Sequence, residues 1–388
     1  MSRRALVVVL DACGVGALPD AADYGDAGTN TLAHLAQASG GLELPTLGAL
    51  GLGAILPLQG VAPAGGANGP VLHGRLHPLG PGKDSTTGHW ELMGVVAPQA
   101  PPTFPEGFPC EVIQAIERLS GRAVLCNVPT DGLAAIEDFG AQQLTSGGLI
   151  VYTSQDSVLQ IAAHEDAVPC AELLEICAAV RRELAEGPFA VGRVIARPFA
   201  GVPGSFERTP GRRDFALPPA TRSYLEELRS AGVPVHTVGK VDQLFAGIGI
   251  DETHAGATNA EAIVSTTALL GSLDHGFVFT NLIETDQVYG HRKDVEGFHA
   301  ALREIDRAVG RWCALMGPED LLILTADHGC DPLHPGTDHT REYAPLLAAF
   351  AGHDGRRHDG PLADVGASVL HWLAARDAPA LPGTSFVP

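Results

Sequence analysis

The chain has little positive charge for its size. It carries 25 lysine and arginine residues against 45 aspartate and glutamate residues, which gives a formal net charge of −20. A protein that binds nucleic acid needs a basic face, so we expect no nucleic-acid partner. A small phosphate ester remains a suitable ligand, because bound metals and a few arginines can supply positive charge locally.

Long hydrophobic runs are also missing. No stretch approaches the roughly 20 apolar residues that cross a membrane. The first apolar run, Ala5–Leu10, is interrupted by Asp11, whereas a secretion signal needs about 7–15 apolar residues. The seven cysteines are scattered and include no CxxC pair, which fits reduced thiols better than a disulfide framework. We therefore expect a cytoplasmic protein that does not associate with membranes.

Short apolar runs alternate with helical segments along the chain. The runs that suit strands buried on both faces of a parallel sheet are Leu6–Leu10, Val235–Val238, Phe277–Ile283 and Leu321–Thr325. Between residues 298 and 316, apolar side chains recur at spacings of four and three, which is the pattern of one helix face. Strand and helix alternate, so the predicted fold class is α/β.

A chain of 388 residues is too long for a single simple hydrophobic core, so two domains are expected. The composition indicates where the second domain begins. A proline-rich segment at residues 98–105 marks an exit from the first domain, and LPPA at residues 217–220 marks the return. We predict a core domain formed by residues 1–98 and 218–388. Residues 99–217 are predicted to form an inserted, smaller α+β cap.

Six polar side chains stand where predicted strands end or just beyond. They are Asp11 in VVVLDACGVG, Asp286 and His291 in ETDQVYGHR, and Asp327, His328 and His339 in LLILTADHGCDPLHPGTDHTR. One aspartate after a strand is usually a turn former or a helix cap. Three carboxylates with three imidazoles, gathered at the carboxyl ends of parallel strands, form the ligand set of two divalent metal ions. Mixed aspartate and histidine ligands suit manganese or zinc.

A hydroxyl-rich segment, Gly82–Glu91, reads GKDSTTGHWE. Taken alone, it is a turn of glycine, serine and threonine. A metal site that transfers phosphoryl groups through a covalent step, however, needs an activated hydroxyl. Outside the inserted cap, this is the richest hydroxyl cluster with charged neighbours.

These motifs resemble the phosphopentomutase family of the alkaline phosphatase superfamily over nearly the whole chain. The resemblance is carried by the strand before Asp11, by the Asp286–His291 spacing, and by GKDSTTGHWE, VYTSQDSVLQIAAHE, VGRVIARPF and TADHGCDPLHPGTDHTREY. It implies an alkaline-phosphatase-like, doubly wound core sheet with an inserted cap. It also implies two manganese ions and a catalytic sugar bisphosphate as activator.

The resemblance assigns the six predicted ligands to two ions. One ion would be held by Asp11, Asp327 and His328 together with a phosphorylated hydroxyl, and the other by Asp286, His291 and His339. The family's phosphorylated residue is usually threonine and corresponds here to Ser85, with Thr86 and Thr87 as further candidates. Lys83 or His89 would assist in a role that the sequence leaves unassigned.

In the cap, the resemblance places Arg193 and Arg208 around the distal phosphate of the sugar, because guanidinium groups bind phosphate with paired hydrogen bonds. Ser154 and Asp156 would approach the sugar. Without the resemblance, Arg193 is an exposed strand residue and Arg208 a loop cation.

The implied reaction interconverts ribose 1-phosphate and ribose 5-phosphate, and the 2-deoxyribose pair, through a 1,5-bisphosphate. Pentose phosphates are therefore the expected partners. The alternatives are a phosphatase, a phosphodiesterase or a phosphoglycerate mutase of the same superfamily, or a binding protein without catalysis.

Two cysteines depart from the family pattern. Cys13 replaces the usual serine, and Cys330 the usual asparagine. Because thiolates are soft ligands, we hypothesise that these cysteines make the site more tolerant of zinc or more sensitive to oxidants.

Overall fold

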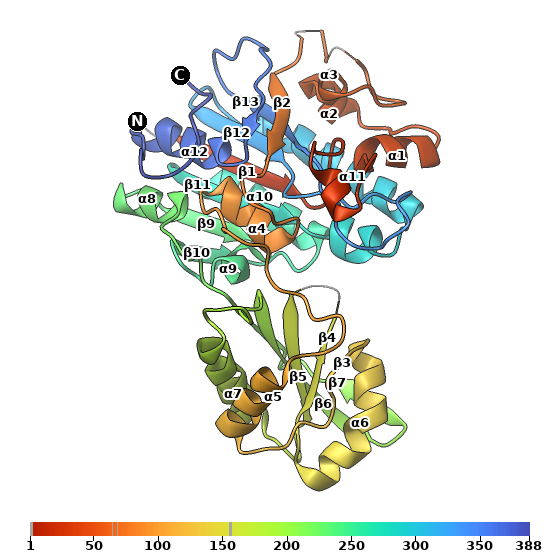
Figure 1. Cartoon of the computed structure of the whole chain (residues 1–388). Coiled ribbons are helices and arrows are strands. Elements are labelled where there is room, and N and C mark those ends of the chain that lie inside the picture. Colours follow the sequence, from red (N-terminus) through yellow and green to blue (C-terminus); the bar gives the residue numbers. More distant parts are fainter. Residues whose placement is uncertain (1–2, 64, 68, 155–156) are drawn as a thin grey trace. The chain divides into compact units, whose positions relative to one another are not determined.

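The structure is a computed structural model that describes residues 3–63, 65–67, 69–154 and 157–388 (Figure 1). It divides into two compact units. Met1–Ala100 and Pro219–Pro388 form the first, called the core unit here, and Pro101–Pro218 form the second, called the inserted unit. The ranges 1–98, 99–217 and 218–388 stay a prediction for the domains.

Within the described residues, an eight-stranded sheet runs through the core unit in the order β10-β9-β11-β1-β12-β13-β2-β14 (Figure 1). The bounds of its strands are β1 (Arg4–Leu10), β2 (Leu72–His77), β9 (Val235–Val238), β10 (Glu252–His254), β11 (Gly276–Leu282), β12 (Asp320–Thr325), β13 (Ala344–Ala349) and β14 (Gly360–Pro361). The four predicted strands are therefore present as β1, β9, β11 and β12.

The middle of this sheet is parallel and almost wholly apolar. β1 pairs in parallel with β11 on one side and with β12 on the other. β11 and β12 are buried along their whole length, as expected for strands that are covered on both faces. β13 and β2 extend the sheet with antiparallel pairing, which the parallel pattern of the apolar runs did not predict.

Helices cover both faces of the sheet. Their bounds are α1 (Thr31–Ala38), α2 (Pro45–Leu50), α3 (Leu52–Ile55), α4 (Ser85–Leu92), α8 (Tyr224–Ser230), α9 (Val241–Leu244), α10 (Asn259–Ser272), α11 (Val295–Leu315) and α12 (Asp364–Ala374), with a 3-10 turn η1 (Ala21–Tyr24) and a π-helical turn η2 (Thr285–Gly290). α10, α2 and α1 pack against α11, whereas α4 and α8 pack against α12. The two groups of helices cover opposite faces of the sheet, which is the doubly wound arrangement.

The helix predicted over residues 298–316 is α11. The Asp294 side chain caps its first turn by accepting a hydrogen bond from the Gly297 amide. Its buried stripe includes Phe298, Leu302 and Ile305. The apolar residues whose spacing predicted this helix therefore form the face that it packs against the core.

The inserted unit has its own sheet, in the order β3-β4-β5-β6-β7, with β8 paired to β6. Its elements are α5 (Cys110–Ser120), β3 (Val128–Pro129), α6 (Gly132–Ser146), β4 (Ile150–Thr153), β5 (Val158–His164), α7 (Cys170–Glu183), β6 (Arg193–Val202), β7 (Ser205–Arg208) and β8 (Arg213–Ala216). Leu159 and Ile161 of β5 belong to the apolar cluster under α5 and α7, and Ala162 belongs to the cluster under α6. Alternating side chains thus fill two cores.

Among the helices of the described residues, none combines the length and the apolar character that a membrane crossing requires.

Candidate metal centre

The carboxyl ends of three neighbouring strands bring the predicted ligands together. Asp11 follows β1 directly, Asp327 lies two residues beyond β12, and Asp286 lies in η2 just after β11. Leu10 is level with Leu282 of β11, so these ends meet at one edge of the sheet. This edge is where open α/β sheets bind their ligands.

One cluster contains Asp11, Asp327 and His328. Nε2 of His328 lies 3.4 Å from Oδ1 of Asp11 and 3.4 Å from Oδ2 of Asp327. All three residues are buried. Two ligands of a common ion with bonds of about 2.0–2.2 Å stand roughly 3.4 Å apart, so the spacing suits one divalent cation.

A second cluster contains Asp286, His291 and His339. Nε2 of His291 is 3.5 Å from Oδ2 of Asp286, and Nε2 of His339 is 3.4 Å from Oδ1 of the same carboxylate. The two imidazole nitrogens are 3.2 Å apart. The ring of His328 stacks on that of His339 with centroids 3.9 Å apart, so the two clusters adjoin.

The orientation of the imidazoles suits metal binding. Nδ1 of His291 lies 2.7 Å from the carbonyl oxygen of Thr337, and Nδ1 of His328 lies 3.1 Å from that of Gly329. When each Nδ1 donates to its carbonyl, Nε2 keeps its lone pair and points into the cluster. Metal-binding histidines are commonly oriented in this way.

Several buried carboxylate oxygens in the clusters have no hydrogen-bond donor. They are Oδ1 of Asp11, Oδ1 of Asp286 and Oδ2 of Asp327. An unpaired buried carboxylate oxygen is costly, because burial removes its hydration. Two cations would satisfy these atoms, so the residues present fit the predicted ions.

The ionisation of the carboxylates is strongly coupled. Burial, reinforced by the charges of Asp327 and Asp286, raises the pKa of Asp11 well above its usual range. Burial also opposes ionisation of Asp286, but the imidazoles around it outweigh burial and hold its pKa well below the usual range. Burial lowers the pKa of His328, which favours the neutral imidazole that a cation needs.

Ser85 is the first residue of α4, and its hydroxyl oxygen lies 3.1 Å from Nε2 of His328. Asp84 caps this helix by accepting from the amides of Thr86 and Thr87. The Thr87 hydroxyl also donates to Asp84, over 2.8 Å. Of the three candidate hydroxyls, that of Ser85 reaches the cluster, whereas that of Thr87 bonds to Asp84.

His89 and Lys83 have different surroundings. Nδ1 of His89 lies 2.8 Å from the carbonyl oxygen of Ser85 and 3.2 Å from Oδ2 of Asp327. Its hydrogen bond to Ser85 lies within α4, and its ring stands beside a predicted ligand, so His89 has the geometry of a positioning residue. Lys83 instead donates to Asp26 over 3.0 Å, which ties two loops together.

Sequence reasoning missed two buried polar residues that hold the centre in place. Asn281 of β11 donates from its side-chain amide to Oδ2 of Asp11 over 3.1 Å. Glu342 accepts hydrogen bonds from the Thr31 amide and hydroxyl and from the Thr340 hydroxyl. The signal for Asn281 was an amide near the end of a mainly apolar strand, whereas Glu342 stands in no pattern that indicates burial.

Both unusual cysteines are buried near the centre. Sγ of Cys330 lies within 4.8 Å of ligand atoms of Asp286 and His291. Sγ of Cys13 lies 3.7 Å from the carbonyl oxygen of Asp11. Burial raises the pKa of each thiol above its ordinary value, so both stay protonated while no cation is bound to them.

The inserted unit carries the predicted sugar-phosphate residues. Ser154 follows β4 directly, whereas Asp156 lies outside the described residues. Arg193 begins β6, with a guanidinium nitrogen 3.6 Å from Oδ2 of Asp214. Arg208 ends β7, opposite Phe199 of β6.

A third arginine, Arg197, lies on the same sheet face as the two predicted arginines. Sequence reasoning missed it. Residues 193, 197 and 199 lie on the same face of β6, because strand side chains alternate. Burial, together with the charges of Arg212 and Arg208, lowers the pKa of Arg197. The side chain of Arg197 also donates to Gln160 over 3.0 Å. Its signal was the four-residue spacing of the arginines in VGRVIARPF.

Comparison with known proteins identifies the superfamily to which the chain belongs. A family model described as the metalloenzyme superfamily matches residues 3–377, so the chain belongs to that superfamily. It is 47% identical over 391 residues to the phosphopentomutase of Caldanaerobacter subterraneus subsp. tengcongensis, covering 100% of this chain and 98% of that protein. It is 48% identical over 394 residues to the phosphopentomutase of Anaeromyxobacter dehalogenans, covering 100% and 99%. Within the superfamily, the chain belongs to the phosphopentomutase family of isomerases, which confirms the predicted resemblance.

A solved structure has the same fold. The PH0037 protein from Pyrococcus horikoshii aligns with a TM-score of 0.52 and 15% sequence identity, covering 97% of this chain and 99% of that one.

Proposed function

We propose that the chain interconverts ribose 1-phosphate and ribose 5-phosphate, and the 2-deoxyribose pair, through a phosphorylated Ser85. The observation that carries the proposal is the position of the Ser85 hydroxyl, 3.1 Å from Nε2 of His328, beside two adjoining clusters of carboxylates and imidazoles. Family membership supports a pentose phosphate as the substrate.

The six clustered residues would hold two divalent cations, manganese in our proposal. Asp11, Asp327 and His328 would bind one, and Asp286, His291 and His339 the other. When bound, such cations lower the pKa of a coordinated hydroxyl and neutralise charge on phosphoryl oxygens.

The reaction that we propose runs in two phosphoryl transfers. In the first, the bond between phosphorus and Ser85 Oγ breaks as a bond forms to the free hydroxyl of the sugar phosphate, which loses its proton. The product is a 1,5-bisphosphate. In the second, Ser85 Oγ attacks the other phosphate, so the isomeric monophosphate leaves and the phosphoserine is restored. A sugar bisphosphate would serve as activator by phosphorylating Ser85 at the start.

Groups around Ser85 keep its hydroxyl in place. Asp84 caps α4, which fixes the first residue of the helix. His89 lies one turn later, bonded through Nδ1 to the Ser85 carbonyl and with the same nitrogen 3.2 Å from Oδ2 of Asp327. This packing would keep the nucleophile close to the predicted ligands, which is what proximity catalysis requires.

In the inserted unit, we propose that Arg193, Arg197 and Arg208 bind the phosphate that is not being transferred. Ser154 and Asp156 would contact the sugar. Three guanidinium groups on one sheet face supply the paired donors that a phosphate dianion accepts. The free cysteines support our proposal of a cytoplasmic location, where thiols stay reduced.

An assay with ribose 1-phosphate tests the proposal. Manganese-loaded protein is supplied with ribose 1-phosphate, with and without a ribose 1,5-bisphosphate primer, while intact-mass spectrometry follows phosphate on the protein. Formation of ribose 5-phosphate, stimulated by the primer and accompanied by a phosphorylated chain, supports it. Release of inorganic phosphate alone would identify a phosphatase, and turnover without any phosphorylated chain would refute the covalent step.

A further inference from the structure

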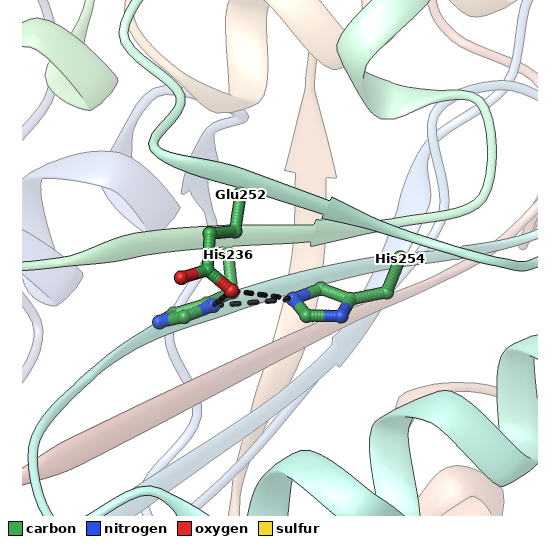
Figure 2. Close-up of side chains that lie close together, drawn as sticks. All are labelled: His236, Glu252 and His254. Carbon is green, nitrogen blue, oxygen red and sulfur yellow. Dashed lines mark hydrogen bonds and ion pairs between the residues drawn. The ribbon is translucent and has the colours of Figure 1, made fainter.

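A third group of possible metal ligands lies on β9 and β10, at one edge of the core sheet (Figure 2). Nδ1 of His236 is 3.2 Å from Nε2 of His254. Oε2 of Glu252 lies 3.7 Å from Nδ1 of His236 and 3.8 Å from Nε2 of His254. Figure 2 shows the three side chains turned toward one another.

The strand register explains why these side chains meet. β10 pairs in parallel with β9, with Glu252 opposite His236 and His254 opposite Val238. Side chains alternate along a strand, so Glu252 and His254 share one face. His236 shares that face because it is the direct partner of Glu252. The group is therefore fixed by the backbone pairing of two strands.

This group is separate from the candidate metal centre. His236 is level with Val278 of β11, which is level with Leu6 of β1. Leu6 stands five residues before Asp11, which corresponds to about 16 Å along a parallel strand. The His236 group is also two strands away from β1. It cannot contribute ligands to the centre at the carboxyl ends.

The three atoms have the spacing of ligands around one small cation. A point equidistant from atoms 3.2, 3.7 and 3.8 Å apart lies about 2.1 Å from each, and zinc binds imidazole nitrogen and carboxylate oxygen at roughly 2.0–2.2 Å. Two imidazoles among three ligands favour zinc over magnesium or calcium, which prefer oxygen alone.

Burial supports the same conclusion. His236 is buried, so its ring is held in place against the other two side chains. The Glu252 side chain is 64% exposed and that of His254 is 26% exposed. The group is thus open to solvent on one side, which leaves room for a water molecule.

We propose that His236, Glu252 and His254 form a zinc site with water as the fourth ligand. The ion would join β10, an edge strand of only three residues, to β9 through side chains as well as backbone. Edge strands this short rely on few hydrogen bonds, so zinc would stabilise this edge by binding only when the two strands are paired.

The test compares metal binding by the full-length protein and by three variants. Glu252→Gln and His254→Gln change the more exposed ligands, which reduces the risk of misfolding. His371→Gln is the matched control, because His371 also faces a carboxylate, Asp377, at 3.0 Å, yet lies on α12. Each protein is loaded with manganese, titrated with zinc ion, and analysed for bound zinc. A parallel titration uses cobalt ion and its visible absorption.

We expect wild type and His371→Gln to bind one more zinc ion than His254→Gln, or to bind it at least about 10-fold more tightly. Glu252→Gln should fall between them. The cobalt spectrum of wild type should contain a four-coordinate band that His254→Gln lacks. Mutase activity should be equal in all four proteins, because the partners of the changed side chains are outside the candidate metal centre. Equal zinc content and equal cobalt spectra in wild type and His254→Gln would overturn the site and leave only a hydrogen bond between the two histidines.

Discussion

Gly88 leaves no room for a β-carbon beside Asp327. A β-carbon on Gly88 would stand 2.5 Å from the carbonyl oxygen of Asp327 and 2.8 Å from its Cβ. α4 therefore packs with its backbone directly against the segment that carries a predicted metal ligand. This close approach sets the distance from Ser85, at the start of the same helix, to the metal centre.

Replacing Gly88 by alanine should displace α4 from Asp327. Because the clash is with backbone, we expect a loss of about 1–3 kcal/mol in the free energy of unfolding and a fall in mutase kcat of at least about 10-fold. Urea denaturation and the coupled mutase assay measure the two effects. Gly271→Ala in α10 is the control, because the added carbon meets no atom within 4 Å beyond its chain neighbours and the backbone of its own helix. It should leave activity unchanged and raise stability by up to about 1 kcal/mol. Equal behaviour of the two variants would show that the contact at Asp327 is not limiting.

Removal of the Ser85 hydroxyl should abolish isomerisation. We expect Ser85→Ala to lose mutase activity by at least about 1,000-fold while it still binds two manganese ions, because the six predicted ligands remain. Ser85→Thr should retain activity, since it keeps the hydroxyl and adds a methyl group that restricts its rotamers. Phosphopeptide mapping gives an independent readout, and phosphate found on Thr86 or Thr87 would contradict the assignment.

Substitution of His89 should weaken positioning without removing the nucleophile. His89→Gln removes the imidazole that bonds to the Ser85 carbonyl and stands 3.2 Å from Oδ2 of Asp327. We expect manganese affinity to fall by about 10–100-fold, as is typical when a residue that orients a metal ligand is changed. Much of the lost mutase rate should return at saturating manganese. Isothermal titration with manganese and kinetics over a range of manganese concentrations check this, and a rate loss that no manganese concentration restores would assign His89 a direct chemical role.

The arginines of the inserted unit should act on the sugar phosphate alone. We expect Arg208→Ala and Arg197→Ala to raise the KM for ribose 5-phosphate by about 10–100-fold, from loss of charge-assisted hydrogen bonds. Hydrolysis of a small aryl phosphate should change little. Arg118→Ala serves as control, because that exposed arginine pairs with Glu183 on the surface. If both substrates suffer equally, the arginines support the fold rather than the substrate.

The two unusual cysteines give a prediction about metal preference. Cys330 lies beside Asp286 and His291, so Cys330→Asn should shift selectivity from zinc toward manganese. In contrast to the oxidant sensitivity hypothesised from the sequence, peroxide should inactivate the protein slowly, because burial raises the pKa of both thiols and thiolates are the reactive form. Metal competition and peroxide time courses on Cys13→Ser, Cys330→Asn and wild type measure the effects. Identical metal selectivity in all three would reject a role for sulfur.

The parallel centre of the fold could be predicted because each of its strands is a run of apolar residues that ends in a polar one. The apolar run that begins at Leu6 predicts a buried strand, and Asp11 marks the end of that strand with a candidate metal ligand. The antiparallel pairing of β2 could not be predicted, because LHGRLH has no such run and its partner β13 lies far away in sequence. Distant pairing of this kind depends on tertiary contacts rather than on local pattern.

For the metal centre, positions at or just after strand ends identified the six predicted ligands that the structure brings together. The residues that hold these ligands in place could not be identified in this way. His89 stands in GKDSTTGHWE without a pattern that shows what it faces, and its contact with Asp327 arises only when two segments far apart in sequence meet. The His236 group was missed for the same reason. Its members are ordinary strand residues until the register of β9 and β10 places them on one face.

The central place of β1 has a consequence for synthesis of the chain. Its two neighbours, β11 and β12, begin at Gly276 and Asp320. During synthesis, β1 is therefore made long before either of its partners. Throughout that interval both edges of this apolar strand are unpaired, which favours aggregation. A chaperone that covers β1 until β11 and β12 have been made should therefore raise the yield of folded protein.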